Sequence, residues 1–139
     1  MNILKLLTKN RITGNAGEDA AAKFLKRKKY KILERNYVAV GCEIDIIAEN
    51  KEFIAFVEVK TRTLGKESES ESRPAAAVTP EKQRKIIAAA KFYTHNDPSE
   101  KNLRLDVIEV YLNENQKVDK ILHFENAFNI NSARKAHRK

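Results

Sequence analysis

The sequence has one cysteine, Cys42, no tryptophan and three histidines. A single cysteine excludes a disulfide framework and is typical of a protein that works in a reducing compartment such as the cytoplasm. The histidines lie 28 and 14 residues apart, at His95, His123 and His137, and these separations match no zinc-ligand spacing. We therefore expect no structural zinc site.

Long apolar runs are also missing. No segment approaches the roughly 20 apolar residues that a membrane-spanning helix needs. Residues 1–10 contain an apolar run too short for a signal peptide and no small-residue cleavage site. We expect a soluble, cytoplasmic protein with no membrane partner.

The 139 residues are 42% hydrophobic, which is enough for one domain with a single core. The net charge is +8 and the pI is near 9.6. Clustered Lys and Arg bind polyanions by releasing condensed counterions, so nucleic acid is the first partner to consider. Solvated basic faces are equally common, and charge alone leaves both interpretations open.

Apolar periodicity divides the chain into elements. A helix is predicted over residues 15–30, and Thr79-Pro80, an N-cap followed by a proline at the first helical position, predicts a second helix over 80–94. The expected inward-facing residues are Glu18, Ala21, Ala22 and Leu25 in the first helix and Gln83, Ile86, Ile87 and Ala90 in the second. Strands are expected over residues 31–40, 43–48, 53–61, 103–112 and 120–124, with a turn at Gly41 and a hairpin through residues 49–52.

This order predicts an α/β or α+β domain in which a mixed five-stranded sheet is flanked by helices. The domain should span residues 11–128, after a short N-terminal extension over 1–10. The polar, Ser- and Glu-rich residues 63–77 are expected to form a mobile loop. Residues 129–139 are expected to form a basic tail.

Chemistry is suggested by Glu58-Val59-Lys60, because a strand places Glu58 and Lys60 on one face, together with Ile54 and Phe56. If the turn 49–52 closes the hairpin, Asp45 lies opposite Phe56 and becomes a diagonal neighbour of Glu58. Two carboxylates this close repel each other unless a cation compensates them.

A divalent metal, Mg²⁺ or Mn²⁺, would be such a cation, because hard cations take carboxylate, phosphate and water oxygens. Asp45 and Glu58 are the expected ligands, and the ammonium of Lys60 would stabilise charge that develops on a phosphate. A metal also lowers the pKa of its bound water. The combination indicates phosphodiester hydrolysis.

Four short motifs resemble those of the YraN family of uncharacterised bacterial proteins, which is similar to archaeal Holliday-junction resolvases and belongs to the PD-(D/E)XK nuclease superfamily. They are Gly17-Glu18, Glu43-Ile44-Asp45-Ile46-Ile47-Ala48, Phe56-Val57-Glu58-Val59-Lys60 and Val78-Thr79-Pro80-Glu81-Lys82-Gln83. The resemblance covers residues 11–128 and rests on the order and spacing of the motifs.

The resemblance implies a restriction-endonuclease-like core with Asp45, Glu58 and Lys60 as the catalytic D…ExK site. It also implies that Glu18 joins the catalytic site and the metal, and that Gln83 joins the catalytic site. Asp106 falls at a further family position to which no role is assigned. The chain departs from the pattern at Ile44, where the superfamily name expects proline, and at Cys42, where glycine is usual.

Each site residue also has a plainer interpretation. Glu18 could form a capping box with Asn15, Glu58 and Lys60 could be ion-paired on a polar sheet face, and Gln83 could bond the backbone. Cys42 is expected to be a small core residue. The basic residues expected to contact nucleic acid are Lys23, Lys26, Arg27, Arg62 and Lys82, although a solvated surface is the alternative.

The leading hypothesis is a Mg²⁺- or Mn²⁺-dependent endonuclease-like protein that hydrolyses DNA, with branched or otherwise structured DNA as the candidate substrates. By analogy with resolvases, it would act as a twofold homodimer. The alternative is a non-catalytic module that binds nucleic acid or a protein on a nuclease fold. A third hypothesis is an assembly protein whose basic tail binds RNA.

Overall fold

A computed structural model describes residues 16–63, 78–96 and 98–129. The expected N-terminal extension, all but the first residue of the expected loop 63–77, and all but the first residue of the basic tail lie outside the described residues. Asn15, the partner of Glu18 in the capping-box interpretation, also lies outside them.

The elements agree with the sequence prediction to within about two residues at most ends. The first helix is described over residues 16–27. It is followed by β1 (Lys31–Ala39), β2 (Cys42–Glu49), β3 (Phe53–Thr63), α2 (Pro80–Asn96), β4 (Asn102–Leu112) and β5 (Val118–Phe124). No helix of the described residues is long and apolar enough to cross a membrane.

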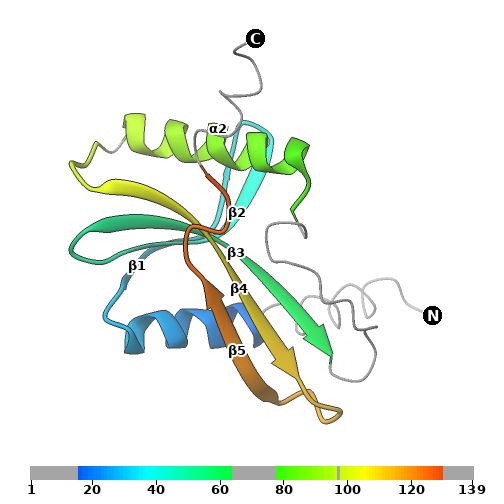
Figure 1. The fold of residues 1–139 in the computed structure, drawn as a ribbon. Helices are drawn as coiled ribbons and strands as arrows, with labels where there is room; N and C mark the ends of the chain where they lie inside the picture. Colours follow the sequence, from blue (N-terminus) through cyan, green and yellow to red (C-terminus); the bar gives the residue numbers. More distant parts are fainter. Residues whose placement is uncertain (1–15, 64–77, 97, 130–139) are drawn as a thin grey trace.

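The strands form one sheet in the order β1-β2-β3-β4-β5. β3 and β4 are parallel, while the other neighbours are antiparallel, so the sheet is mixed. The parallel pair is joined through α2, as parallel strands need a crossover connection. α2 covers one face of the sheet and the first helix covers the other (Figure 1). The predicted five-stranded α+β architecture is confirmed.

Each face of the sheet has its own apolar core. Ile54 and Phe56 of β3 pack with α2, while Ala55 and Val57 pack with the first helix. Because side chains alternate along a strand, Glu58 and Lys60 continue the face of Phe56, as predicted. Of the expected inward residues, the apolar ones are buried: Ala21, Ala22, Leu25, Ile86, Ile87 and Ala90.

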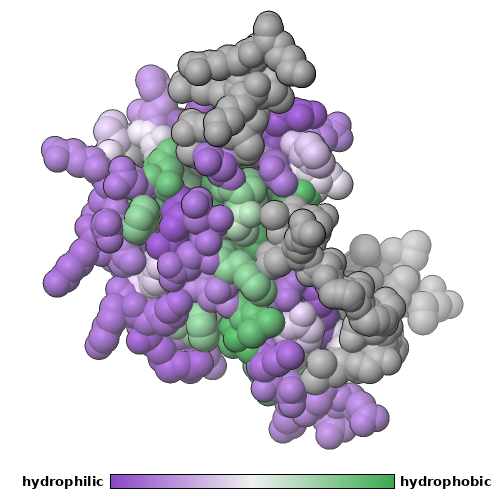
Figure 2. All heavy atoms as spheres, in the orientation of Figure 1, coloured by the Kyte–Doolittle hydropathy of each residue, from purple (hydrophilic) through white to green (hydrophobic). Residues whose placement is uncertain are grey.

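The outer surface is mostly polar. Figure 2 shows hydrophilic side chains over most of the viewed face, with an apolar band below α2 and over β5. Leu122 of β5, which is an edge strand of the sheet, is 37% exposed. Apolar exposure on this scale is ordinary for a folded domain.

The first helix lies very close to β3. A Cβ atom added to Gly17 would be 2.0 Å from the hydroxyl oxygen of Thr61. Glycine at this position therefore lets the helix approach the strand. At the other end, Lys29 has a φ of 74°, and the Tyr30 amide donates to the Leu25 carbonyl at 3.0 Å. This is a Schellman ending, which positions Tyr30 beneath the helix.

The predicted register of the β2–β3 hairpin is wrong by two residues. Ala48 pairs with Ala55, and not with Phe53. The cause is Asn50, whose side-chain oxygen accepts hydrogen bonds from the amides of Glu52 at 2.9 Å and Phe53 at 2.8 Å and so closes the turn one residue later. In the observed register Asp45 lies opposite Glu58 and no longer opposite Phe56.

Candidate functional site

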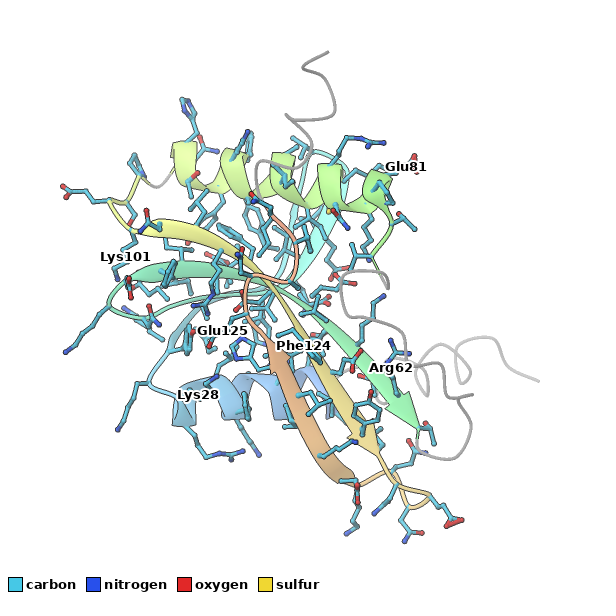
Figure 3. All side chains as sticks on the ribbon, viewed as in Figure 1. Lys28, Arg62, Glu81, Lys101, Phe124 and Glu125 are labelled. Atoms are coloured by element: carbon cyan, nitrogen blue, oxygen red, sulfur yellow. The ribbon has the colours of Figure 1, made fainter. Side chains whose placement is uncertain are left out.

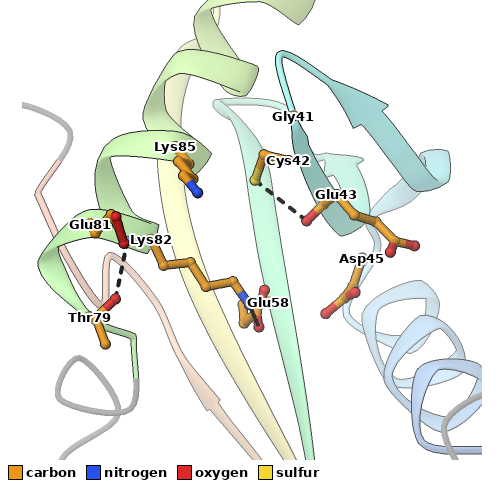
Figure 4. A pocket seen from close by; sticks show the side chains of 9 residues that line it. All are labelled: Gly41, Cys42, Glu43, Asp45, Glu58, Thr79, Glu81, Lys82 and Lys85. Carbon is orange, nitrogen blue, oxygen red and sulfur yellow. Dashed lines mark hydrogen bonds and ion pairs between the residues drawn. The ribbon is translucent and has the colours of Figure 1, made fainter.

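A hollow of about 320 Å³ lies between the N-terminal part of α2, the start of β2 and the middle of β3 (Figure 4). Carboxylates from the two strands form one wall, and lysines from α2 form the facing wall. The lining residues are Gly41, Cys42, Glu43, Asp45, Glu58, Thr79, Glu81, Lys82 and Lys85. The hollow therefore has acidic groups on one side and basic groups on the other.

Asp45 lies where β2 and β3 stop pairing. The last paired residues are Ile46 and Val57, and beyond them the Val59 amide donates to Asp45 Oδ2 at 2.8 Å. Burial and the neighbouring Glu58 carboxylate, with smaller contributions from Glu18 and Glu43, raise the pKa of Asp45 from 3.8 to about 7. The Val59 hydrogen bond opposes this rise only in part. Asp45 is thus a partly buried carboxyl group surrounded by other acids.

Glu58 is buried, with 7% of its surface exposed, and two lysines compensate it. Lys82 Nζ donates to Glu58 Oε2 at 2.8 Å, and Lys60 Nζ lies 3.5 Å from the same oxygen. The hydrogen bond to Glu58 raises the pKa of Lys82. Because one oxygen carries both contacts, the structure brings Glu58, Lys60 and Lys82 together in one group.

Glu18 approaches this group from the first helix but is held by β1. Its Oε1 is 3.6 Å from a guanidinium nitrogen of Arg35. In the orientation that satisfies its neighbours, the Asn36 amide donates to Glu18 Oε1 at 3.1 Å and to Glu43 Oε2 at 2.9 Å. Glu18 acts on Asp45 as a nearby negative charge.

Gln83 points toward the start of its own helix. Its Nε2 donates to the Val78 carbonyl at 2.9 Å, and Gln83 does not line the hollow. Thr79 caps the same helix, because its hydroxyl accepts the Lys82 amide at 3.2 Å, as the sequence predicted. The contact agrees with the backbone-bonding interpretation of Gln83, and its catalytic role stays a prediction.

Sequence reasoning did not find Asn36 and Arg35. Asn36 lies between Arg35 and Tyr37, which pair with Ile46 and Ile44, so it is across from Asp45. Its φ of 55° is in the left-handed region, which asparagine tolerates better than most residues. An asparagine within a strand was the available signal, since asparagine is depleted in strands.

The donor set limits what metal the site can hold. In residues 16–63, 78–96 and 98–129, no three His, Cys, Asp or Glu side chains are arranged to hold an ion by themselves. Mg²⁺ is commonly bound by one or two carboxylates together with water and substrate phosphate. Asp45 and Glu58, which line one hollow, fit that mode, whereas Glu18 does not line the hollow.

The expected nucleic-acid contacts fall in different places. Lys23, Lys26 and Arg27 are exposed on the first helix, whereas Lys82 lines the hollow on the α2 side. Arg62 pairs with the buried Glu109 at 3.3 Å. Since the two helices cover opposite faces of the sheet, these five residues do not make one flat surface.

Comparison with known proteins identifies the family to which the chain belongs. A UPF0102 protein of Caldanaerobacter subterraneus is 44% identical over 117 residues, covering 83% of this chain and 93% of the relative. A UPF0102 protein of Clostridium acetobutylicum is 42% identical over 122 residues, covering 87% and 97%. The model of the uncharacterised protein family UPF0102 matches residues 17–110, which hold all four motifs and the acidic wall of the hollow. The chain therefore belongs to family UPF0102, the YraN family that its motifs resemble.

Proposed function

We propose that this protein is a Mg²⁺- or Mn²⁺-dependent endonuclease that hydrolyses phosphodiester bonds in DNA, with branched DNA as its preferred substrate. The observation that carries the proposal is Asp45, a partly buried carboxyl group with acidic neighbours and a pKa raised to about 7. Such a group is costly unless a cation joins it. Strongly perturbed titratable groups in a hollow are typical of functional sites.

The residues in and around the hollow would have different roles in hydrolysis. Asp45 and Glu58 would hold the metal, which supplies a water of lowered pKa and polarises the phosphate. Lys60, beside Glu58, is placed to stabilise the negative charge that grows on the phosphate oxygens. Asn36 donates to both Glu18 and Glu43, whose charges act on Asp45, and so helps to fix the electrostatic field around Asp45. In the hydrolysis a water would attack phosphorus and lose a proton to solvent, the P–O bond to the leaving oxygen would break, and that oxygen would take a proton from solvent.

A cleavage assay tests the proposal. The full chain is incubated with branched, duplex and single-stranded DNA in Mg²⁺, in Mn²⁺ and in EDTA. We expect metal-dependent cutting, fastest on branched DNA, that Glu58→Gln and Lys60→Met each reduce at least about a hundredfold, the scale seen when a transition-state contact is removed. Glu114→Gln, on the exposed β4–β5 loop, is the matched carboxylate control and should cut normally.

The same assay separates the competing functions. DNA binding by the wild type and both site variants without cutting would overturn the nuclease proposal and favour the binding module. The observation that favours the non-catalytic binding module is that two lysines of the chain already neutralise Glu58. Symmetric cutting of a branch requires two copies of the site, so the proposal includes a homodimer, which sedimentation equilibrium tests.

A further inference from the structure

Lys82 occupies the oxygen that a bound cation needs. Its ammonium lies 2.8 Å from Glu58 Oε2, closer than Lys60 at 3.5 Å to the same atom. Glu58 has 8% of its side chain exposed, so this charged hydrogen bond is formed in a partly desolvated place, where such bonds are strong. A cation that approaches Glu58 through the hollow therefore competes with Lys82.

The position of Lys82 within α2 is unfavourable for a lysine. Thr79 is the N-cap and Pro80 begins the helix, so Lys82 lies in the first helical turn. The positive end of the helix dipole disfavours cations there. Glu58 offsets this cost while the ion pair lasts. When a metal takes Glu58, the freed lysine needs another anion.

The surroundings provide a place for that anion. The side chain of Lys82 is 43% exposed and lines the hollow, as does Lys85 one turn later. Lys82 crosses the hollow toward Glu58, while Lys85 remains on the α2 wall (Figure 4). A phosphate that enters the hollow beside the metal would meet both lysines and the amide end of α2.

We infer that Lys82 is an exchangeable counter-ion: it neutralises Glu58 while the metal is absent and moves to the substrate phosphate when the metal binds. The inference rests on the proposed function, since it assumes a cation at Asp45 and Glu58. Lys82 would thereby couple the two ligands, because metal bound to Glu58 frees Lys82 for the phosphate, and phosphate bound to Lys82 frees Glu58 for the metal.

The first test measures Mn²⁺ affinity without DNA, by electron paramagnetic resonance and calorimetry on the full chain. Lys82→Met removes the competitor, so Mn²⁺ should bind about tenfold more tightly, a change equivalent to 1.4 kcal/mol. Lys85→Met removes the same charge from the same helix without an ion pair to Glu58 and should have a clearly smaller effect. Equal affinities in the wild type and Lys82→Met would overturn the inference.

The second test measures DNA affinity in Ca²⁺, used as a cation expected to bind without supporting cleavage, and in EDTA. Lys82→Met should weaken DNA binding about tenfold in Ca²⁺, the scale of one charged contact, and much less in EDTA, where Glu58 already holds Lys82. Equal weakening in both conditions would overturn the transfer of Lys82 to phosphate. Failure of every form, Lys82→Met included, to bind Mn²⁺ would overturn the proposed metal site as well, whereas unchanged Mn²⁺ binding overturns only the exchange.

Discussion

Two carboxyl groups, Asp45 and Asp106, lie in the interior of this small domain under opposite conditions. Asp106 is fully buried and accepts two hydrogen bonds from Arg104 at 2.9 Å, one from His123 at 2.8 Å and one from the Asn126 amide at 3.0 Å. Although burial acts to raise it, these bonds lower the pKa of Asp106. Asp45 has the Val59 amide and three acidic neighbours, and its pKa rises to about 7.

The difference separates a carboxyl group that the chain itself compensates from one that lacks such compensation. Arg104, His123 and Asn126 satisfy Asp106 from within the chain, so nothing further is needed there. In the described residues no cation forms an ion pair with Asp45, although the charge of Lys82 acts on it from a greater distance. The first helix joins the two regions, because Glu18 near its start acts on Asp45 while Lys28 at its other end reaches toward His123 and Glu125 (Figure 3).

The largest expected effect is at Asp106. Asp106→Asn leaves the buried guanidinium of Arg104 without its main partner and should lower the free energy of unfolding by about 3–5 kcal/mol, measured by urea denaturation at pH 7. Because the folded pKa is lowered, the wild-type contribution is present above the unfolded pKa and is lost as pH falls through the folded pKa. Asp119→Asn, at an exposed position of β5, is the control. A loss below about 1 kcal/mol would contradict a structural role for Asp106.

At Asp45 we expect the free energy of unfolding to change in the opposite direction. Its folded pKa lies above 3.8, so in the metal-free protein stability falls as pH rises from 3.8 to about 7 and is constant above that. Asp45→Asn keeps an oxygen for the Val59 amide and removes the charge. It should therefore raise the free energy of unfolding at pH 8 by about 2–4 kcal/mol, since one pKa unit is 1.36 kcal/mol.

Two conditions sharpen this second prediction. Near pH 4 the stability advantage of Asp45→Asn over the wild type should largely disappear. At pH 8 saturating Mg²⁺ should reduce that advantage, because only the wild type is stabilised by bound metal. Denaturation of both proteins across this pH range provides the measurement. If Asp45→Asn destabilises the protein at every pH, Asp45 is structural like Asp106, and the contrast between the two fails.

The sequence predicted the elements because apolar periodicity and the Thr79-Pro80 cap are local signals. It also pointed to Asp45, since a carboxylate within an apolar strand is costly without a partner. The register was missed because the Asn50 turn was not anticipated. The partners of Asp106 could not be assigned, because Arg104, His123 and Asn126 meet only when β4, β5 and the following turn are assembled.

A smaller effect should follow from pushing the first helix away from Asp45. Gly17→Ala places a methyl group 2.0 Å from the Thr61 hydroxyl and should cost about 1–3 kcal/mol, the usual range for overpacking. Thermal unfolding of Gly17→Ala with Thr61→Ala, which removes that hydroxyl, should recover part of the loss. An additive result would show that the close contact with Thr61 does not set the position of the helix. If the position of this helix affects the hollow, metal affinity should fall in the single variant Gly17→Ala but not in the double variant.

The smallest effect is expected at the other end of the same helix. Lys28 Nζ lies 2.9 Å from His123 Nδ1, and an ammonium only donates, so His123 accepts at Nδ1 and donates from Nε2 to Asp106. Lys28→Met should cost at most about 1 kcal/mol, because the lysine is partly exposed, and leave metal affinity unchanged. Nitrogen NMR of His123 should show the proton on Nε2 in both proteins. A proton on Nδ1 and none on Nε2 would mean that His123 donates no hydrogen bond to Asp106, which would contradict the contrast drawn with Asp45.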